Sequence, residues 1–380
     1  MTMPRLAAVT VALLCSCLLF AAGCGSAVTA GTTVTTETAA STETSIATDA
    51  AQLFPVVIDG KLGYINNQGE MVIPPQFEFV DWPYSHFFEG LAPVSVGGKF
   101  GYIDATGTMV IQPLFDIADP FSEGLAEVGD NNLWGFIDET GTVVVPMHYG
   151  QHPGPFSEGL CAVMVDERLG GGKLQIEYID RTGTVVLGPF EQSTGFSEGL
   201  AAVGFGEDDA VKWGYIDATG RVVIPPQFDW VREFSEGLAA VGFPANNDAA
   251  KWGYIDKTGA VVIEPRFDGV DPFSEGLAAV EFLQDDAVRY GYIDKTGTVV
   301  IRPQFEWAME FSEGLAAVGT NSGLCGYIDK TGAFVIPMKL EGQAFHPFSG
   351  GLARIDTTTT DGSVSPTYID RTGKVIWRAQ

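Results

Sequence analysis

Short apolar runs, separated by turn residues, recur along most of this chain. In one stretch the runs cover residues 237–241, 252–256 and 260–263, and Gly, Asp, Asn and Pro stand between them. Aromatic and β-branched runs of this length favour β-strands, and turn residues between them favour hairpins. Each such stretch is therefore predicted to form a small antiparallel meander of three strands.

Both faces of the predicted middle strand are apolar. Alternation places Trp252 and Tyr254 on one face and Gly253 and Ile255 on the other. A small sheet with two apolar faces must be covered on both sides, most simply by the sheets of neighbouring copies. The aromatic residues are therefore predicted to pack between copies, and Gly253 to let a neighbouring aromatic side chain approach the backbone. A platform for stacking carbohydrate rings is the alternative.

The middle strand recurs at a nearly constant spacing. The aromatic residue of its Gly-Tyr-Ile-Asp motif stands at Tyr64, Tyr102, Phe136, Tyr178, Tyr215, Tyr254, Tyr292, Tyr327 and Tyr368, at intervals of 38, 34, 42, 37, 39, 38, 35 and 41 residues. Self-similarity at a fixed period indicates a tandem repeat. The chain is therefore predicted to carry about nine meander units with a period of about 38 residues.

A tight turn follows each middle strand. In Asp256-Lys257-Thr258-Gly259 the carboxylate can accept hydrogen bonds from backbone N–H groups two residues on, and Gly259 supplies a positive φ. Gly297 holds the same place in the next copy. A structural turn explains the recurring aspartate better than a metal site does.

A second motif, Phe-Ser-Glu-Gly-Leu-Ala, lies between successive middle strands. Its Ser and Glu are predicted to bond local backbone in a turn. Because Glu recurs in seven copies, a ladder of carboxylates that binds cations is the alternative. The motif begins at Phe121, Phe156, Phe196, Phe234, Phe273 and Phe311, with degenerate copies at Phe87 and Phe348.

At these motifs the chain resembles the WG-repeat family of bacterial β-repeat proteins. The resemblance covers roughly residues 54–377, and copies that lack the Trp-Gly pair mostly keep a bulky or apolar residue before the Gly. It implies a β-repeat fold but no activity, because the family has no defined biochemical role. The name-giving pair stands here as Trp134-Gly135, Trp213-Gly214 and Trp252-Gly253.

Units of about 40 residues with three or four strands are typical of propeller blades. Residues 54–380 are therefore predicted to form an all-β, propeller-like repeat domain, in which the first and last units act as caps. Nine units exceed the usual number of blades, so an open superhelical β-solenoid is the alternative.

The N-terminus is typical of an exported lipoprotein. Arg5 and the apolar run at 6–20 have the form of a signal peptide, predicted as residues 1–23. Residues 21–24, Ala-Ala-Gly-Cys, resemble the bacterial lipobox, which implies cleavage before Cys24 and lipid attachment to it. Residues 24–53, rich in Thr, Ala and Ser, are then predicted to be a lipidated cysteine and a flexible tether. The folded part is expected in the cell envelope, attached to the membrane only through the lipid. An ordinary secretory signal peptide is the alternative.

Charge and cysteine content narrow the choice of partners. A formal net charge of −27 argues against nucleic acid and against an anionic membrane surface, because both bind basic patches. Of the five cysteines, only Cys161 and Cys325 fall in the predicted repeat domain. They stand at non-equivalent positions and are predicted to be small core residues, not a disulfide.

The sequence shows no catalytic constellation. Every conspicuous polar residue is repeated, whereas an active site is normally a single cluster. His148 and His152 are four residues apart, but Pro146 and Pro153 disfavour a helix, so this spacing predicts no zinc site. The chain is therefore predicted not to be an enzyme, with no catalytic residue, no cofactor and no metal site.

Acidic loops that vary between copies, at 206–209, 245–248 and 284–286, are where a repeat scaffold usually carries specificity. Ca²⁺ binding there is a weaker hypothesis, since none has the alternating oxygen ligands of a calcium loop. The predicted function is a surface-anchored, non-catalytic binding or scaffold module that engages a protein partner. A cell-wall glycan-binding protein is the first alternative, because the hairpin is similar to those of choline-binding cell-wall repeats. An enzyme with an unrecognised pocket is the second.

Overall fold

The computed structural model describes residues 52–79, 85–166, 174–206, 211–244, 250–284, 287–342, 344–358 and 364–378. All of them belong to the second of two units, residues 48–380. The predicted signal peptide, Cys24 and nearly all of the predicted tether lie outside the described residues, as do most positions of the three acidic loops.

The described residues form strands joined by turns. The strands are β1 (Phe54–Ile58), β2 (Lys61–Ile65), β3 (Met71–Glu78), β4 (Leu91–Val96), β5 (Lys99–Asp104), β6 (Met109–Phe115), β7 (Ile117–Ala118), β8 (Leu125–Asp130), β9 (Leu133–Asp138), β10 (Val143–Tyr149), β11 (Leu160–Asp166), β12 (Leu174–Asp180), β13 (Val185–Phe190), β14 (Leu200–Phe205), β15 (Lys212–Asp217), β16 (Val222–Phe228), β17 (Trp230–Ser235), β18 (Leu238–Pro244), β19 (Ala250–Asp256), β20 (Val261–Phe267), β21 (Gly269–Val270), β22 (Leu277–Gln284), β23 (Ala287–Asp294), β24 (Val299–Phe305), β25 (Trp307–Ala308), β26 (Ala316–Gly319), β27 (Leu324–Ile328), β28 (Phe334–Glu341), β29 (Ala344–Phe345), β30 (Leu352–Thr358), β31 (Val364–Asp370) and β32 (Val375–Arg378).

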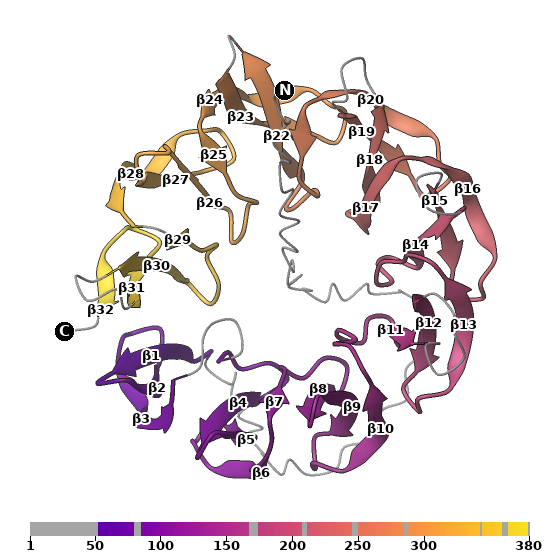
Figure 1. Cartoon of the computed structure of the whole chain (residues 1–380). Helices are drawn as coiled ribbons and strands as arrows, with labels where there is room; N and C mark the ends of the chain where they lie inside the picture. The colour runs from indigo at the N-terminus through magenta and orange to yellow at the C-terminus, as the bar shows by residue number, and fades with distance from the viewer. Residues whose placement is uncertain are drawn as a thin grey trace, which may run out of the picture. The chain divides into compact units, whose positions relative to one another are not determined.

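These strands build eight antiparallel sheets, which follow one another around a ring as an eight-bladed β-propeller (Figure 1). Seven sheets have three or four strands in sequence order, as in β17-β18-β19-β20. The first has six strands, because two copies of the meander, β1-β2-β3 and β4-β5-β6, are joined by the pairing of Glu78 with Ser95. The all-β, propeller-like prediction is confirmed, but the expected nine units form eight sheets.

The meander has a bulge that the sequence pattern did not show. Trp252 pairs with Phe267 while Tyr254 pairs with Ile263, so the register shifts between them and β20 bends outward. The bend lays the backbone of β20 on Gly253, where a Cβ atom would collide with Ile263 O. Gly253 is therefore needed by its own sheet. The expectation that it admits an aromatic side chain from a neighbouring copy is wrong.

The core lies between successive sheets, as the two apolar faces predicted. Tyr254 and Ile263 of one sheet share a cluster of buried residues with Phe273, Val280 and Ile293 of the next. Tyr254 is fully buried, and its hydroxyl donates to Asp271 O at 2.8 Å, so its one polar group is satisfied at the junction. The tyrosines at the same position of five other copies donate in the same way: Tyr102 to Asp119 O, Tyr178 to Thr194 O, Tyr215 to Arg232 O, Tyr292 to Met309 O and Tyr327 to His346 O.

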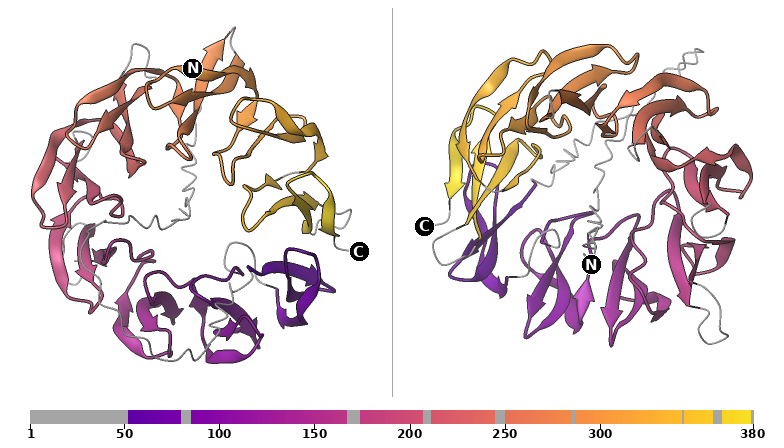
Figure 2. Two further views of the ribbon diagram at one scale, coloured as in Figure 1. Left: turned by 180° about the vertical axis from the view of Figure 1, so that it is seen from behind. Right: turned by 45° about the horizontal axis from the view of Figure 1, so that its top comes forward.

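The ring closes between its first and last sheets, which are neighbours in both views of Figure 2. The Tyr368 hydroxyl donates to Pro55 O at 2.8 Å, and the rings of Tyr368 and Phe54 meet edge to face at 5.6 Å. Gln52 Nε2 donates to Ser349 Oγ at 2.7 Å. These contacts overturn the open β-solenoid alternative, and they also show that the end units do not act as solvent-facing caps.

Cys161 and Cys325 are buried, free thiols, which confirms their prediction as core residues. Burial raises the pKa of both thiols, that of Cys325 to about 12. Within the described ranges, the structure contains no helix long and apolar enough to cross a membrane.

Candidate functional site

The recurring aspartate closes its turn as predicted. Asp256 Oδ1 accepts hydrogen bonds from Thr258 N at 2.9 Å, Thr258 Oγ1 at 2.6 Å and Ala260 N at 3.1 Å. These donors, the Thr258 hydroxyl first, lower the pKa of Asp256. In the first copy Asn66 accepts from Gln68 N and Glu70 N in the same way. Because an uncharged amide can replace the carboxylate, the conserved function of this position is hydrogen-bond acceptance in the turn.

The Phe-Ser-Glu-Gly motif joins each copy to the following one. Ser274 and Leu277 pair across a two-residue turn, whose Glu275 and Gly276 have φ of 52° and 87°. A glutamate with positive φ is strained, and Asn or Gly would fit such a turn better. Glu275 is nevertheless used here because its carboxylate accepts from Gly314 N at 2.9 Å, in the next copy.

The serine of the motif makes a second bond across the same junction. Ser274 Oγ donates to Phe311 O at 2.7 Å, again in the next copy. The expectation that Ser and Glu bond local backbone is therefore wrong: both reach forward by about one repeat. The serine bond recurs from Ser122 to Phe156 O, Ser157 to Phe196 O, Ser197 to Phe234 O, Ser235 to Phe273 O and Ser312 to Phe348 O.

The ladder of carboxylates is matched by the chain's own cations. Lys330 Nζ lies 3.0 Å from Glu275 Oε2, and Lys295 Nζ lies 3.0 Å from Glu236 Oε2. Lys257 holds the same relation to Glu198 at 3.1 Å. Together with the backbone donors, these ammonium groups account for the repeated glutamates as junction residues. They favour the structural interpretation over a ladder that binds free cations.

The Trp-Gly tryptophans are half-buried on their own sheets. The ring of Trp134 lies 3.2 Å from the position of a Cβ on Gly129, its cross-strand partner, and Gly242 is covered by Trp230 from one neighbouring strand and by Trp252 from the other. Trp213 is half-buried opposite Gly204. An aromatic ring over a strand glycine replaces the packing that the glycine lacks. This use leaves less of each ring free for stacking a sugar.

The turn glycines contact the preceding sheet. Gly259 and Gly297 have φ of 84° and 82°. A Cβ on Gly259 would lie 2.9 Å from Ile224, and one on Gly297 would lie 3.0 Å from Ile263. The other predicted site residues, Gly135 and Gly214, lie under the bulged outer strand as Gly253 does.

Among the described residues, one group of acidic and histidine side chains has the spacing of possible metal ligands. It consists of Asp119, directly after β7, Glu127 in β8 and His152 in the connection between β10 and β11, and all three ligand atoms lie within 4.8 Å of one another. Asp119 N donates to Glu127 O at 2.9 Å, so the first two residues are cross-strand neighbours. We call these three residues the Asp-Glu-His cluster.

The cluster places a carboxylate in the core. Glu127 is 3% exposed, and its Oε2 accepts from Gly154 N at 2.9 Å. Burial raises the pKa of Glu127 to about 8. His152 Nε2 lies 2.6 Å from Asp119 Oδ2, and this hydrogen bond raises the pKa of His152. Glu127 therefore holds a proton at neutral pH that a glutamate in water would lose.

Sequence reasoning missed this cluster. Glu127 stands where Ala162, Ala202, Ala240, Ala279 and Ala317 stand in the other copies with the full motif, and this departure was the available signal. His152 was set aside because its spacing from His148 suits only a helix. The structure shows that His148 is not involved: its ring lies against Tyr149, at a centroid distance of 4.1 Å.

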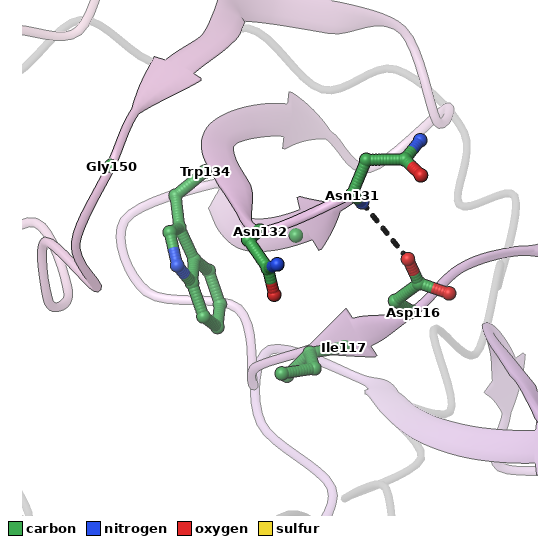
Figure 3. Close-up of a pocket in the computed structure, with 7 residues that line it drawn as sticks. Asp116, Ile117, Asn131, Asn132, Trp134 and Gly150 are labelled. Carbon is green, nitrogen blue, oxygen red and sulfur yellow. Dashed lines mark hydrogen bonds between the residues drawn. The ribbon is translucent and has the colours of Figure 1, made fainter.

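A hollow of about 650 Å³ adjoins the cluster. Trp134, Asn132 and Ile117 turn toward it in Figure 3, where Asn131 N donates to Asp116 Oδ2 at 2.9 Å. The edge of Trp134 also meets His152, at a centroid distance of 4.5 Å, so one indole ring contacts both the hollow and the cluster. The lining residues are Asp116, Ile117, Gly129, Asn131, Asn132, Trp134 and Gly150.

Apolar side chains are exposed along the outer strands. The last strand of each copy lies on the periphery of the ring (Figure 1), and every one of them except β3, which pairs with β4, is an edge strand. It begins with two apolar residues, at least one of which is exposed in every copy. We call the exposed ones the rim residues; they are Met71, Val72, Val110, Val143, Val185, Val186, Val222, Val261, Val262, Val299, Val300, Phe334, Val335 and Val375.

Known structures and one family model are similar to this chain. One solved chain, titled "Crystal structure of the eukaryotic initiation factor", is 13% identical with a TM-score of 0.61, covering 86% of this chain and 95% of its own, so the likeness is one of fold. BamB from Moraxella catarrhalis is also 13% identical, with a TM-score of 0.36, over 83% of this chain and 95% of its own. Among curated proteins, none matches this chain. The model of the WG containing repeat matches residues 63–100, 100–134, 134–168, 213–242, 252–282, 290–322 and 326–356. The chain therefore belongs to the family of proteins with the WG containing repeat.

Proposed function

We propose that this protein is a non-catalytic scaffold of the cell envelope, which binds a protein partner through its rim residues. The observation that carries the proposal is the apolar pair that recurs, exposed, around the outer strands. Exposed apolar residues that gather on one part of a protein surface are typical of protein interaction sites. Here the exposure is built into the repeat itself.

The polar residues of the repeat support the same conclusion by elimination. Asp256 closes a turn, Ser274 and Glu275 bond the next copy, and the Tyr254 hydroxyl is satisfied within the core. Groups already engaged in such bonds are not free to act on a substrate. What the repeat leaves available to a partner is the outer surface.

Edge strands that bind a partner must not bind one another. The rim strands carry proline, as at Pro265 and Pro303, which removes a backbone donor and limits edge-to-edge pairing. Strong negative charge further opposes self-association. We infer that the partner is a different protein that offers apolar side chains and has a basic or neutral surface.

The location is part of the proposal. A signal peptide at 1–23 and a lipid on Cys24 would bring the domain into the envelope, and the Thr-rich tether would let it reach a partner. Metabolic labelling with an alkyne fatty acid tests this part. Label on the wild-type chain and none on Cys24→Ser is expected; equal labelling of both contradicts it.

The partner itself is tested by photo-crosslinking in intact cells. A photo-reactive residue at Val262 or Val300, both exposed on outer strands, is expected to capture one protein in stoichiometric yield. The matched control is the same residue at Thr258, which lies in the turn of the same sheet. Capture of peptidoglycan alone, or equal capture from Thr258, contradicts a protein partner at the rim.

A further inference from the structure

We propose that the Asp-Glu-His cluster of Asp119, Glu127 and His152 is a binding site for one divalent transition-metal ion, of the Zn²⁺ class. This site is independent of the rim residues and of their partner. It departs from the expectation, drawn from the sequence, that the chain has no metal site.

Two carboxylate oxygens of the cluster have no hydrogen-bond partner. Glu127 Oε1 and Asp119 Oδ1 are both buried and accept no hydrogen bond, and His152 Nδ1 approaches Glu127 Oε1 only to 3.6 Å. Glu127 itself is 3% exposed, so no bulk water offsets the loss of that bond. A buried acceptor without a donor costs stability, and a cation among the three side chains would satisfy both oxygens together.

The distances suit a metal once the imidazole shifts, because its Nε2 now faces Asp119 and its Nδ1 faces Glu127. The imidazole and the two carboxylates already present one ligand atom each within 4.8 Å of one another. Ligands held tetrahedrally at about 2.1 Å from a metal are about 3.4 Å apart. The contact of 2.6 Å between His152 Nε2 and Asp119 Oδ2 must therefore open, with the metal replacing the proton between them. His152, whose side chain is 45% exposed, has the freedom to make that shift.

The donor set selects the class of ion. One imidazole nitrogen with two carboxylates suits Zn²⁺, Mn²⁺ or Fe²⁺, whereas Ca²⁺ and Mg²⁺ are bound by oxygen ligands alone. Three protein ligands leave a fourth position for water or a bound group. The ring of Trp134 contacts His152 and lines the hollow, so the cluster lies beside an open space.

In the last copy, the protein's own positive side chain neutralises a carboxylate at the place equivalent to the cluster. There His346 N donates to Arg354 O, in the backbone relation that joins Asp119 to Glu127. Arg354 Nε lies 2.6 Å and His346 Nε2 3.1 Å from the two oxygens of Asp356. This carboxylate has a guanidinium beside it. Glu127 and Asp119 have only the imidazole of His152 between them.

The test is titration of the purified full-length chain with Zn²⁺ and Co²⁺ at raised ionic strength, with excess Mg²⁺ to occupy exposed carboxylates. We expect one equivalent of Zn²⁺ per chain, and Co²⁺ absorption bands of a complex with mixed nitrogen and oxygen ligands. Glu127→Ala and His152→Ala are each expected to weaken this binding by at least about tenfold. Glu127→Ala installs the residue of five other copies, so it should preserve the fold.

His148→Ala is the matched control, because it removes a nearby exposed histidine outside the cluster, and it should bind metal as the wild type does. His152→Ala changes an exposed side chain and gives a second variant whose folding can be checked by circular dichroism. Absence of a stoichiometric equivalent in the wild type overturns the proposal. So does full retention of that equivalent by either Glu127→Ala or His152→Ala.

Discussion

The hydroxyl of Tyr368 donates to the carbonyl oxygen of Pro55 at 2.8 Å, across 313 residues of sequence. The same bond joins Tyr254 to Asp271 within the array, where the partners are 17 residues apart. The junction between the two ends of the chain is thus built like the junctions between consecutive copies.

Removing this hydroxyl tests ring closure. We expect Tyr368→Phe to destabilise the domain by about 1 kcal/mol, the net value of one buried hydrogen bond. Tyr254→Phe should cost about the same, and Phe136 shows that phenylalanine fits this position in a natural copy. Thermal unfolding of both variants measures the effect. In an open array Tyr368→Phe would leave the melting temperature unchanged.

Alanine substitutions at Gly253 and Gly237 distinguish the cost of steric crowding from the cost of a positive φ. A Cβ at Gly253 would lie 2.8 Å from Pro265 N as well as against Ile263 O, so Gly253→Ala should cost about 3 kcal/mol or more. Gly237 has a φ of 85° but open space around it, and Gly237→Ala should cost only about 1–2 kcal/mol. Denaturant unfolding compares the two variants. Equal losses would show that the bulge of β20 does not crowd Gly253.

The turn aspartate should tolerate an amide but not a methyl group. We expect Asp256→Ala to destabilise the domain by about 1 kcal/mol, as loss of a side-chain acceptor does at a helix N-cap. Asp256→Asn keeps the acceptor, as Asn66 does naturally, and should cost less than half of that. Melting temperatures of the two variants decide the matter. Equal destabilisation by both would mean that the negative charge is needed.

The buried Glu127 makes stability depend on pH. Its pKa is raised to about 8, so the folded chain holds a proton that the unfolded chain releases near pH 4.5. The resulting stabilisation is complete below the unfolded value and is lost as the pH rises through about 8. The raised pKa of His152 also makes stability fall as the pH rises. Asp119 and Cys161 are the other titratable groups beside Glu127.

Glu127→Ala removes most of this dependence. With a metal chelator present, the melting temperature of Glu127→Ala minus that of the wild type should be larger at about pH 9 than at about pH 5. Calorimetry at the two pH values measures the difference, and His148→Ala serves as the control for a change of surface charge. A Glu127→Ala difference that stays constant with pH would contradict the raised pKa.

The repeat and its turns could be read from the sequence because they depend on local chemistry. Alternation at Trp252 and Tyr254 identifies the middle strand, and Asp256 and Gly259 identify the turn, whatever surrounds them. Closure of the ring depends instead on the small rotation between successive sheets, which no single copy encodes. The contact of Tyr368 with Pro55 therefore had no sequence signal.

Two errors arose from treating the copies as regular and alike. Pairing by simple alternation assumes an unbroken register, so the bulge of β20 was invisible and Gly253 was assigned the wrong neighbour. Comparison of copies also emphasises what they share. Glu127 is informative because it differs from the alanines of other copies, and its neighbours Asp119 and His152 come close only in three dimensions.

The rim residues have a consequence for how strongly a partner is held. Equivalent apolar pairs repeat at each outer strand, so a partner with several apolar segments can occupy more than one pair at once. The second and later contacts are then intramolecular, with an effective concentration set by the spacing along the partner. Binding of this kind is avidity: replacing one pair would change it little, while shortening the partner would weaken it steeply.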